Sequence, residues 1–228
     1  MNATGPRPFK IQAMVFDFDG TLAELLIDFE AMKRDVAALA RELRLPCPPL
    51  EAPVLEWIAC VEGLAVCENP VGAPHFSRRA RTLVMEMELE AAGRATLFPF
   101  TREVLIELGR RSVKTAVITR NCREAVQRVF PDLEAYCGCL LARDDVERVK
   151  PHPDHLTKAM EALSAHPDST LMVGDHPLDM ETGKRAGVLT AGVWSGRASR
   201  EGLMTSGARW TAPHCGDLVA LLAEQGLI

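Results

Sequence analysis

The chain has 228 residues, of which 47% are hydrophobic and 25% are charged, and its formal net charge is −5. A chain of this length can bury a sizeable core and can hold one domain with a smaller insertion. The negative charge and the lack of a long basic run exclude nucleic acid as the main partner. Seven scattered cysteines without a CxxC pair are typical of reduced thiols rather than of a disulfide framework.

The sequence contains neither a membrane-spanning pattern nor a secretory-signal pattern. No apolar run approaches the roughly 18 residues that suggest a membrane span, and residues 1–10 lack the apolar region of a secretory signal. We therefore expect a cytoplasmic protein that has no membrane partner.

Apolar runs that alternate with helical patterns make up most of the chain. The first run, at residues 11–16, is typical of a buried strand and ends in acidic residues. Later runs lie at residues 113–119, 139–142, 170–174 and 188–194, and the run at 139–142 is the weakest. Helical spacing marks the segments 104–108, 125–129 and 156–163 between them. Strands that alternate with helices predict an α/β domain with a parallel sheet.

The stretch from residue 22 to residue 97 breaks this alternation. It holds no convincing strand, and apolar residues follow helical spacing at 29–43, 55–61 and 76–91. The second and third patterns begin just after Pro53 and Pro74, and proline is favourable at a helix start. We interpret the stretch as a helical insertion between the first strand and the rest of the α/β core.

The first chemical motif, Asp17-Phe18-Asp19-Gly20-Thr21, follows the first predicted strand. Ligands of open α/β sheets bind beyond the carboxyl ends of the strands, and alternation places Asp17 and Asp19 on one side of an extended chain. Two close carboxylates need a positive neighbour, and oxygen ligands suit Mg²⁺. Gly20 allows a sharp turn that exposes N–H groups to an anion. The alternative is a strand-end turn capped by aspartates.

An EF-hand loop also opens with two aspartates at this spacing. It requires glycine where this chain has Leu22 and glutamate where it has Asp28. This mismatch excludes a calcium loop of that kind.

Thr119, Arg120 and Asn121 follow the predicted strand at 113–119. A hydroxyl next to a helix start can bind an anion together with unpaired N–H groups. The alternative is a helix cap in which Asn121 pairs with Glu124.

Two more polar motifs occur further along. Lys150 precedes Pro151 and Pro153, so it lies on a stiff turn and could act as a point charge for phosphate; a solvated lysine is the alternative. Asp175 ends the run at 170–174, and Asp179 either supports the same site or compensates a helix dipole. Each of these later motifs alone is weak evidence for a functional site, but together they place polar groups at or near the carboxyl ends of successive predicted strands.

The four motifs in this order resemble the haloacid dehalogenase-like hydrolase superfamily, in its phosphoglycolate-phosphatase-like branch with a helical cap. The resemblance rests on Asp17-Phe18-Asp19-Gly20-Thr21, Ile118-Thr119-Arg120-Asn121, Lys150-Pro151 and Gly174-Asp175-His176-Pro177-Leu178-Asp179. It implies a Rossmann-like parallel-sheet core over residues 1–22 and 98–228, with an inserted all-helical cap over residues 23–97. His176 departs from many relatives, which have a small hydroxyl residue there; we favour a capping role for it.

The resemblance also implies roles for the site residues. Asp17 would be the nucleophile that forms an aspartyl-phosphate, and Asp19 would be the general acid and then the general base. The residues implied to hold the phosphate are Thr119, Arg120 and Lys150. The implied Mg²⁺ ligands are Asp17, Asp19 (through its backbone carbonyl) and Asp175, with Asp179 in support.

We therefore expect a Mg²⁺-dependent phosphatase that acts on a small phosphomonoester, either phosphoglycolate-like or a sugar phosphate. A carboxylate at position 19 favours phosphoryl chemistry, because dehalogenase relatives lack it. A sugar-phosphate mutase is the first alternative. A non-catalytic binding protein is less favoured, because the motif residues Asp17, Asp19, Lys150 and Asp175 are all present.

The cap contains one cluster of positive charge. Its members are Arg78, Arg79 and Arg81, which lie off the apolar face of their predicted helix. They could bind a distal anionic group of the substrate, but a solvated helix face is the favoured interpretation. No motif in the cap identifies the substrate or the oligomeric state.

Overall fold

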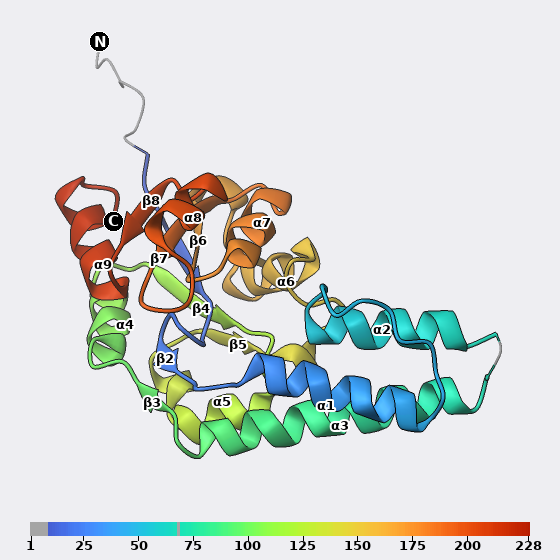
Figure 1. Cartoon of the computed structure of the whole chain (residues 1–228). Helices are drawn as coiled ribbons and strands as arrows, with labels where there is room; N and C mark the ends of the chain where they lie inside the picture. Colours follow the sequence, from blue (N-terminus) through green and yellow to red (C-terminus); the bar gives the residue numbers. More distant parts are fainter. Residues whose placement is uncertain (1–8, 68) are drawn as a thin grey trace, which may run out of the picture. The chain divides into compact units, whose positions relative to one another are not determined.

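The computed structural model describes residues 9–67 and 69–228, and the chain divides into two compact units. The core unit comprises the chain up to Leu25 and from Ala95 onward, and the cap unit comprises Leu26–Arg94. Figure 1 traces both units by colour along the sequence.

The core unit is built on a six-stranded sheet in the order β5-β4-β1-β6-β7-β8. All of its neighbouring strands run parallel. The strands are β1 (Ala13–Phe16), β4 (Lys114–Ile118), β5 (Cys139–Leu141), β6 (Thr170–Gly174), β7 (Leu189–Val193) and β8 (Trp210–Ala212). The strand order reverses beside β1, and this reversal is where open α/β sheets bind ligands. The predicted α/β parallel fold is confirmed.

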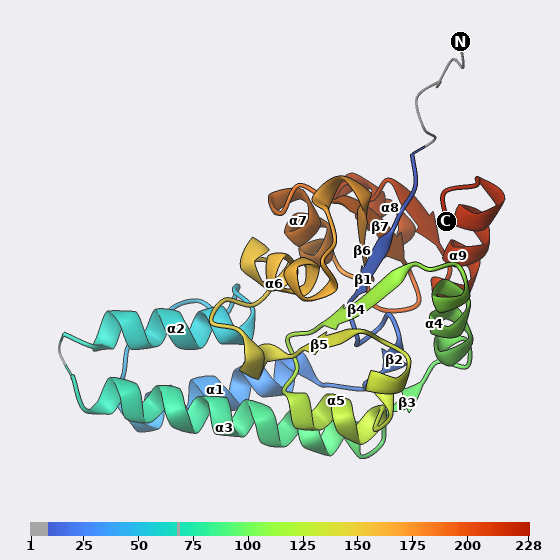
Figure 2. The same ribbon diagram turned by 180° about the vertical axis from the view of Figure 1, so that it is seen from behind.

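Helices cover the sheet of the core unit. They are α4 (Thr101–Arg110), α5 (Arg123–Val129), α6 (Pro153–Leu163), α7 (Pro177–Arg185), α8 (Arg200–Thr205) and α9 (Cys215–Glu224). Helix α6 packs on β1, β4 and β5, whereas α7 packs on β6 and β7. Figures 1 and 2 show α6 beside α7, with α4 and α9 grouped together on the other side of the core unit.

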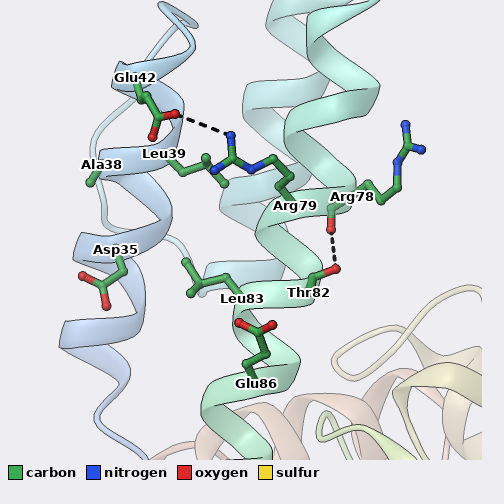
Figure 3. Close-up of a pocket in the computed structure, with 9 residues that line it drawn as sticks. All are labelled: Asp35, Ala38, Leu39, Glu42, Arg78, Arg79, Thr82, Leu83 and Glu86. Carbon is green, nitrogen blue, oxygen red and sulfur yellow. Dashed lines mark hydrogen bonds and ion pairs between the residues drawn. The ribbon is translucent and has the colours of Figure 1, made fainter.

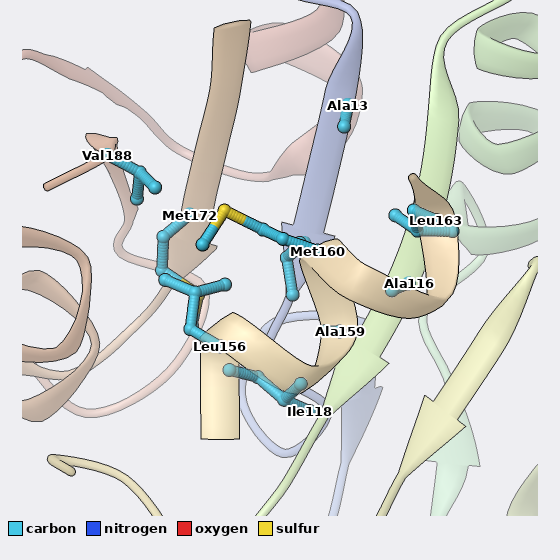
Figure 4. Packing of buried hydrophobic residues seen from close by; sticks show 10 residues of the cluster. Ala13, Ala116, Ile118, Leu156, Ala159, Met160, Leu163, Met172 and Val188 are labelled. Carbon is cyan, nitrogen blue, oxygen red and sulfur yellow. The ribbon is translucent and has the colours of Figure 1, made fainter. Parts of the chain in front are cut away.

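The face of the sheet under α6 forms a closely packed cluster (Figure 4). Ala13 of β1 and Ala116 of β4 meet the apolar side of α6, and their small side chains let the helix approach the sheet. The helix contributes Leu156 and Leu163, which are almost fully buried. Burial of each such leucine stabilises the fold by about 1.5–3 kcal/mol. This packing fixes the start of α6, and with it the loop that carries Lys150.

A short antiparallel ribbon joins the core unit to the inserted segment. Strands β2 (Ala23–Glu24) and β3 (Thr96–Leu97) pair Ala23 with Leu97 and Glu24 with Thr96. The expectation of no strand between residues 22 and 97 is wrong at both ends, because two-residue strands are too short to produce a periodic pattern. The compact units accordingly divide a few residues inside the expected boundaries of 22 and 98.

The cap unit consists of α1 (Phe29–Glu42), α2 (Val54–Ala65) and α3 (Gly72–Ala92), which pack on one another. Its interior includes an edge-to-face contact between Trp57 and Phe76, whose ring centroids are 6.4 Å apart. Helix α3 begins two residues before Pro74, contrary to expectation, because the Asn69 side chain accepts a hydrogen bond from the Gly72 N–H at 2.7 Å. No helix within the described ranges is long and apolar enough to cross a membrane.

Candidate active site

Asp17 lies directly after β1, and its side chain is 13% exposed. Its backbone N–H donates to the carbonyl of Val173 at 2.8 Å, which continues the parallel pairing one residue beyond the strand. The next side chain, Phe18, is fully buried and anchors the turn. Asp19 follows two residues after Asp17, and the charge of Asp17 adds to the burial that raises the pKa of Asp19. The loop after β1 thus carries two acidic side chains.

A tight turn follows these two aspartates. Gly20 has φ of 77°, in the region that favours glycine, and its N–H donates to the carbonyl of Ala23 at 2.8 Å. The hydroxyl of Ser195, from the loop after β7, donates to the carbonyl of Gly20 at 2.7 Å. Loops after β1 and β7 are therefore joined directly at this end of the sheet.

Replacing Gly20 with alanine should damage this turn. An added Cβ would lie 2.4 Å from Oδ2 of Asp175, and the positive φ would add strain. We expect Gly20→Ala to lower the free energy of unfolding by about 1–3 kcal/mol, measured by urea denaturation. Gly63→Ala is the control, because nothing lies within 4 Å of its added Cβ and alanine favours the helix. Equal stability of the two variants would contradict this account of the turn.

Lys150 is the central cation of the site. Its Nζ lies 2.7 Å from Oδ1 of Asp17 and 2.7 Å from Oδ1 of Asp179, and its side chain is only 2% exposed. Burial alone would lower the pKa of Lys150, but Asp17 and Asp179 outweigh it and raise that pKa above its ordinary value. The ammonium group therefore stays charged between two carboxylates.

Asp175 lies in the turn between β6 and α7, and Asp179 lies in the first turn of α7. The buried side chain of Asp175 accepts a hydrogen bond from the Arg197 N–H at 3.0 Å. Asp179 accepts one from the His176 N–H at 3.1 Å, while Nδ1 of His176 accepts one from the Leu178 N–H at 3.2 Å. His176 therefore caps α7, which is the role favoured from the sequence.

Burial shapes the acid–base properties of the carboxyl groups. It raises the pKa of Asp17 to about 6 even though Lys150 opposes the shift. It raises the pKa of Asp19 to about 7. It also raises the pKa of Asp175 to about 8, with further contributions from the charges of Asp17 and Asp179. Shifts of this kind are common at sites that bind a cation or transfer a proton.

A metal ion would fit this cluster. Carboxylate oxygens of Asp17, Asp175 and Asp179 lie within 4.8 Å of one another, and a set of oxygen donors suits Mg²⁺. A cation would also stabilise the charged forms of carboxylates that burial disfavours. The residues present therefore fit Mg²⁺.

The position of Asp19 differs from that of the clustered acids. Its Oδ1 accepts a hydrogen bond from the Leu25 N–H at 3.0 Å, where β2 leads out of the core unit. The expected ligands were Asp17, Asp19 and Asp175, with Asp179 in support. The acidic cluster contains the carboxylate of Asp179 and not that of Asp19. A carboxylate outside the cluster is compatible with a separate proton-transfer role, and coordination through the Asp19 carbonyl stays a prediction.

Thr119 and Asn121 lie directly after β4. The hydroxyl of Thr119, which is almost fully buried, accepts a hydrogen bond from the Asn121 N–H at 3.2 Å. The alternative interpretation, a cap formed by Asn121 and Glu124, is wrong, because α5 starts after Cys122 without a side-chain cap. Among the described residues, buried Nδ2 of Asn121 finds no hydrogen-bond acceptor. An unsatisfied buried donor is costly, so this amide suits an anionic ligand.

Arg120 and His155 both contact the backbone of Lys150. The guanidinium of Arg120 donates to the Lys150 carbonyl, and Nδ1 of His155 accepts a hydrogen bond from the Lys150 N–H at 3.2 Å. A phosphate-binding role for Arg120 stays a prediction. His155 was missed in the sequence, where it reads as one more residue on the core side of α6.

Two of the three cap arginines contact side chains of the cap unit. Arg79 lies 3.5 Å from Glu42, and Nε of Arg81 donates to the hydroxyl of Ser77 at 3.4 Å. A groove of about 560 Å³ runs along the surface where α1 packs on α3 (Figure 3). Its charged lining consists of Asp35, Glu42, Arg78, Arg79 and Glu86. Mixed charge of this kind supports a solvated face.

Comparisons with known proteins agree with the fold and the motifs. The family model for haloacid dehalogenase-like hydrolases matches residues 70–193. Pyrophosphatase PpaX of Bacillus mycoides is 39% identical over 206 residues, which cover 84% of this chain and 89% of that protein. Pyrophosphatase PpaX of Anoxybacillus flavithermus is 36% identical over 117 residues, which cover 50% of this chain and 54% of that protein. The chain thus spans about half the length of several curated relatives that it matches.

A solved structure supports the same fold. The crystal structure of a hydrolase from Pseudomonas syringae matches with a TM-score of 0.69 and 20% identity, over 93% of this chain and 98% of that chain. Together with the family match and the relative from Bacillus mycoides, this confirms the resemblance seen in the four motifs. The chain belongs to the haloacid dehalogenase-like hydrolase family.

Proposed function

We propose that this protein is a Mg²⁺-dependent phosphatase of small phosphorylated metabolites, with Asp17 as the nucleophile. One observation carries the proposal: buried Lys150 holds Asp17 and Asp179 at 2.7 Å each, beside the carboxylate of Asp175. A structural ion pair needs one acid and one base. Three acids around one lysine leave negative charge that a metal ion would balance.

Asp17 would attack the phosphorus atom and displace the leaving group, which forms an aspartyl-phosphate. Its Oδ1 accepts hydrogen bonds from Lys150 and from the Phe18 N–H, so these contacts orient the carboxylate. Lys150 would also offset the repulsion between this carboxylate and an incoming phosphate. Water then hydrolyses the aspartyl-phosphate and frees Asp17, so that one difficult displacement becomes two easier ones.

Asp19 is suited to move the proton. Burial raises its pKa to about 7, so near neutral pH both of its protonation states are well populated. The protonated form would donate to the leaving oxygen, and the carboxylate would then take a proton from the attacking water. A positioned acid–base group of this kind typically contributes a factor of roughly 10²–10⁴.

The residues that would hold the metal are Asp17 and Asp175, with Asp179 in support and the carbonyl of Asp19 as a further ligand. When bound, Mg²⁺ supplies charge neutralisation for the phosphoryl oxygens and the attacking carboxylate. Thr119 and Asn121, with its unsatisfied buried amide, would bind the phosphoryl group from the end of β4.

The candidate substrates fall into two classes, phosphomonoesters and pyrophosphate. The motif pattern favours phosphomonoesters, such as phosphoglycolate or a sugar phosphate. The relatives named pyrophosphatase favour inorganic pyrophosphate as a second candidate. Both would use the same nucleophile, but phosphate is a better leaving group than an alcohol. Hydrolysis of pyrophosphate should therefore depend less on Asp19 than hydrolysis of a phosphomonoester does.

The test is phosphate release from a panel that contains 2-phosphoglycolate, sugar phosphates, nucleotides, p-nitrophenyl phosphate and pyrophosphate. We expect release that requires Mg²⁺ and is abolished by a chelator. Absence of release from every compound would refute the proposal. A requirement for a sugar bisphosphate activator, with little phosphate released, would identify a mutase instead.

The raised pKa values predict how the stability of the metal-free protein depends on pH. Burial raises the pKa of Asp17 to about 6, of Asp19 to about 7 and of Asp175 to about 8, from 3.8. The native state then binds more protons than the unfolded state between roughly pH 4 and pH 8, so the free energy of unfolding falls as pH rises through this window. We expect the calorimetric Tm of metal-free protein to fall between pH 5 and pH 8.

Mg²⁺ should oppose this trend, because it binds the carboxylate forms. At a concentration of 100 Kd a ligand stabilises by about 2.7 kcal/mol, which raises the Tm of a chain of this size by roughly 5–11 °C. We expect this increase at pH 8 and a smaller one at pH 5. The variant Asp175→Asn should lose most of the Mg²⁺ effect. An equal Mg²⁺ effect at both pH values would contradict binding to these carboxylates.

A further inference from the structure

The site depends on where one flexible side chain ends. Nζ of Lys150 must lie between Asp17 and Asp179 to make both 2.7 Å contacts. Lysine reaches this point through a four-carbon stem, which allows many rotamers. A small displacement of the Lys150 backbone would therefore move the ammonium away from one of its two carboxylates.

His155 holds the backbone of Lys150 through a fully buried contact. The Lys150 N–H donates to Nδ1 of His155 at 3.2 Å, and Nε2 of the same ring lies 2.9 Å from the carbonyl of Leu141 at the end of β5. Since Nδ1 accepts, Nε2 carries the proton and donates. The ring is 0% exposed, and burial lowers its pKa to about 4, so it stays neutral near neutral pH.

The other side of the same residue is also held. The guanidinium of Arg120 donates to the Lys150 carbonyl, and the carbonyl of Arg120 accepts a hydrogen bond from Arg143 at 2.9 Å. Both polar groups of the Lys150 backbone are thus bonded to side chains, one from the end of β4 and one from α6. Helix α6 is itself fixed on the sheet by its apolar cluster.

We propose that His155 is a positioning residue, which ties the Lys150 backbone to the end of β5 and so sets the ammonium between Asp17 and Asp179. The proposal rests on the proposed function, because it concerns the efficiency of that site. His155 touches none of the reacting groups, and it acts through Lys150.

Two substitutions at position 155 separate its two hydrogen bonds. In His155→Asn, Oδ1 takes the place of Nδ1 and can still accept from the Lys150 N–H. In His155→Gln, the longer amide reaches the place of Nε2 and can still donate to Leu141, but it does not hold Lys150 in the same way. If positioning of Lys150 matters, His155→Gln should lower kcat by roughly 10–100-fold, with a smaller change in KM. His155→Asn should stay within a few-fold of wild type.

His152→Ala is the matched control. His152 caps the same helix, with Nδ1 accepting from the Asp154 N–H at 3.2 Å. Among the described residues its hydrogen bonds go to Asp154 and Val149 rather than to Lys150, Asp17 or Asp179. Its loss should destabilise α6 while kcat stays near the wild-type value. If His155→Asn and His155→Gln lose equal activity, or if the control loses as much, the positioning role is refuted.

A second measurement does not depend on activity. The variants His155→Gln and Lys150→Met, alone and combined, form a double-mutant cycle. The quantity measured is the stability of each variant, taken from the midpoint of its unfolding in urea. A positioning role predicts non-additive effects, because His155 has no ammonium to position once Lys150 is methionine. Additive effects would refute the coupling. Failure of wild-type protein to release phosphate would instead refute the proposed function and leave this cycle as the test of the contact.

Discussion

Asp17→Asn is expected to reduce phosphate release by about 10⁴-fold or more, because the amide cannot form the aspartyl-phosphate. The structure makes this a specific test. Asparagine has nearly the same shape, and its side-chain oxygen can still accept hydrogen bonds from Lys150 and from the Phe18 N–H, as Oδ1 of Asp17 does at 2.7 Å each. The fold should therefore be preserved. Burial disfavours the charged form of Asp17, so removing that charge should cost little stability.

The measurement is a single-turnover assay at saturating Mg²⁺ on the best substrate of the panel, accompanied by circular dichroism. Asp168→Asn serves as the control, because the Asp168 side chain is 88% exposed and lies before β6, at the opposite end of that strand from Asp175. Activity of Asp17→Asn within about tenfold of wild type would exclude Asp17 as the nucleophile. A folded but inactive variant would support the proposed role.

Lys150→Met is expected to cause the largest combined loss of activity and stability. It leaves the carboxylates of Asp17 and Asp179 without the cation that lies 2.7 Å from each. Removal of one partner from a buried charge cluster typically costs about 3–5 kcal/mol, which corresponds to a fall in Tm of roughly 6–20 °C for a chain of this length. Activity should fall by about 10²–10³-fold, because the variant lacks the charge proposed to stabilise the transferring phosphoryl group.

The loss of stability should also depend on pH. Without the ammonium group, the carboxylates of Asp17 and Asp179 can take up protons at low pH, which relieves their repulsion. The Tm difference between Lys150→Met and wild type should therefore be larger at pH 8 than at pH 5. Lys158→Met is the matched control, because Lys158 lies on an exposed position of α6. Differential scanning calorimetry on both variants provides the measurement. Similar Tm values for the two variants would show that Lys150 is not needed to balance the acids.

The core of the fold follows from strong local patterns. Strand β6 spans Thr170–Gly174 as predicted. Strand β1 starts two residues later than predicted, and β4 and β7 are each one residue shorter at both ends. These strands are buried on both faces, so they appear in the sequence as apolar runs. Strand ends could be read for the same reason, since each run stops at a polar residue. That is why Asp17 and Asp175 could be placed together in advance, whereas Lys150 ends no apolar run and was assigned through the order of the motifs and the family resemblance.

The remaining features depend on contacts that no local pattern encodes. Strands β2 and β3 have two residues each, and β8 has three, so neither period nor length marks them. The role of His155 arises from two partners, one of them in β5, and only the folded chain brings them together. The sequence position of Asp179 suggested that it supports the site, but its contacts could not be predicted. In the structure one of its oxygens bonds to Lys150 and the other to the His176 N–H.

The β2–β3 ribbon makes the cap unit a modular insertion. Ala23 pairs with Leu97, and the Phe98 N–H donates to the carbonyl of Leu22 at 3.1 Å, so the chain leaves the core unit and returns to it at neighbouring points. The entropy of closing the inserted loop grows only with the logarithm of its length. Insertions of quite different sizes could therefore replace residues 26–94 at little thermodynamic cost to the sheet. In evolutionary terms, a ribbon of four residues would let the inserted segment diversify while the groups proposed to transfer the phosphoryl group stay unchanged.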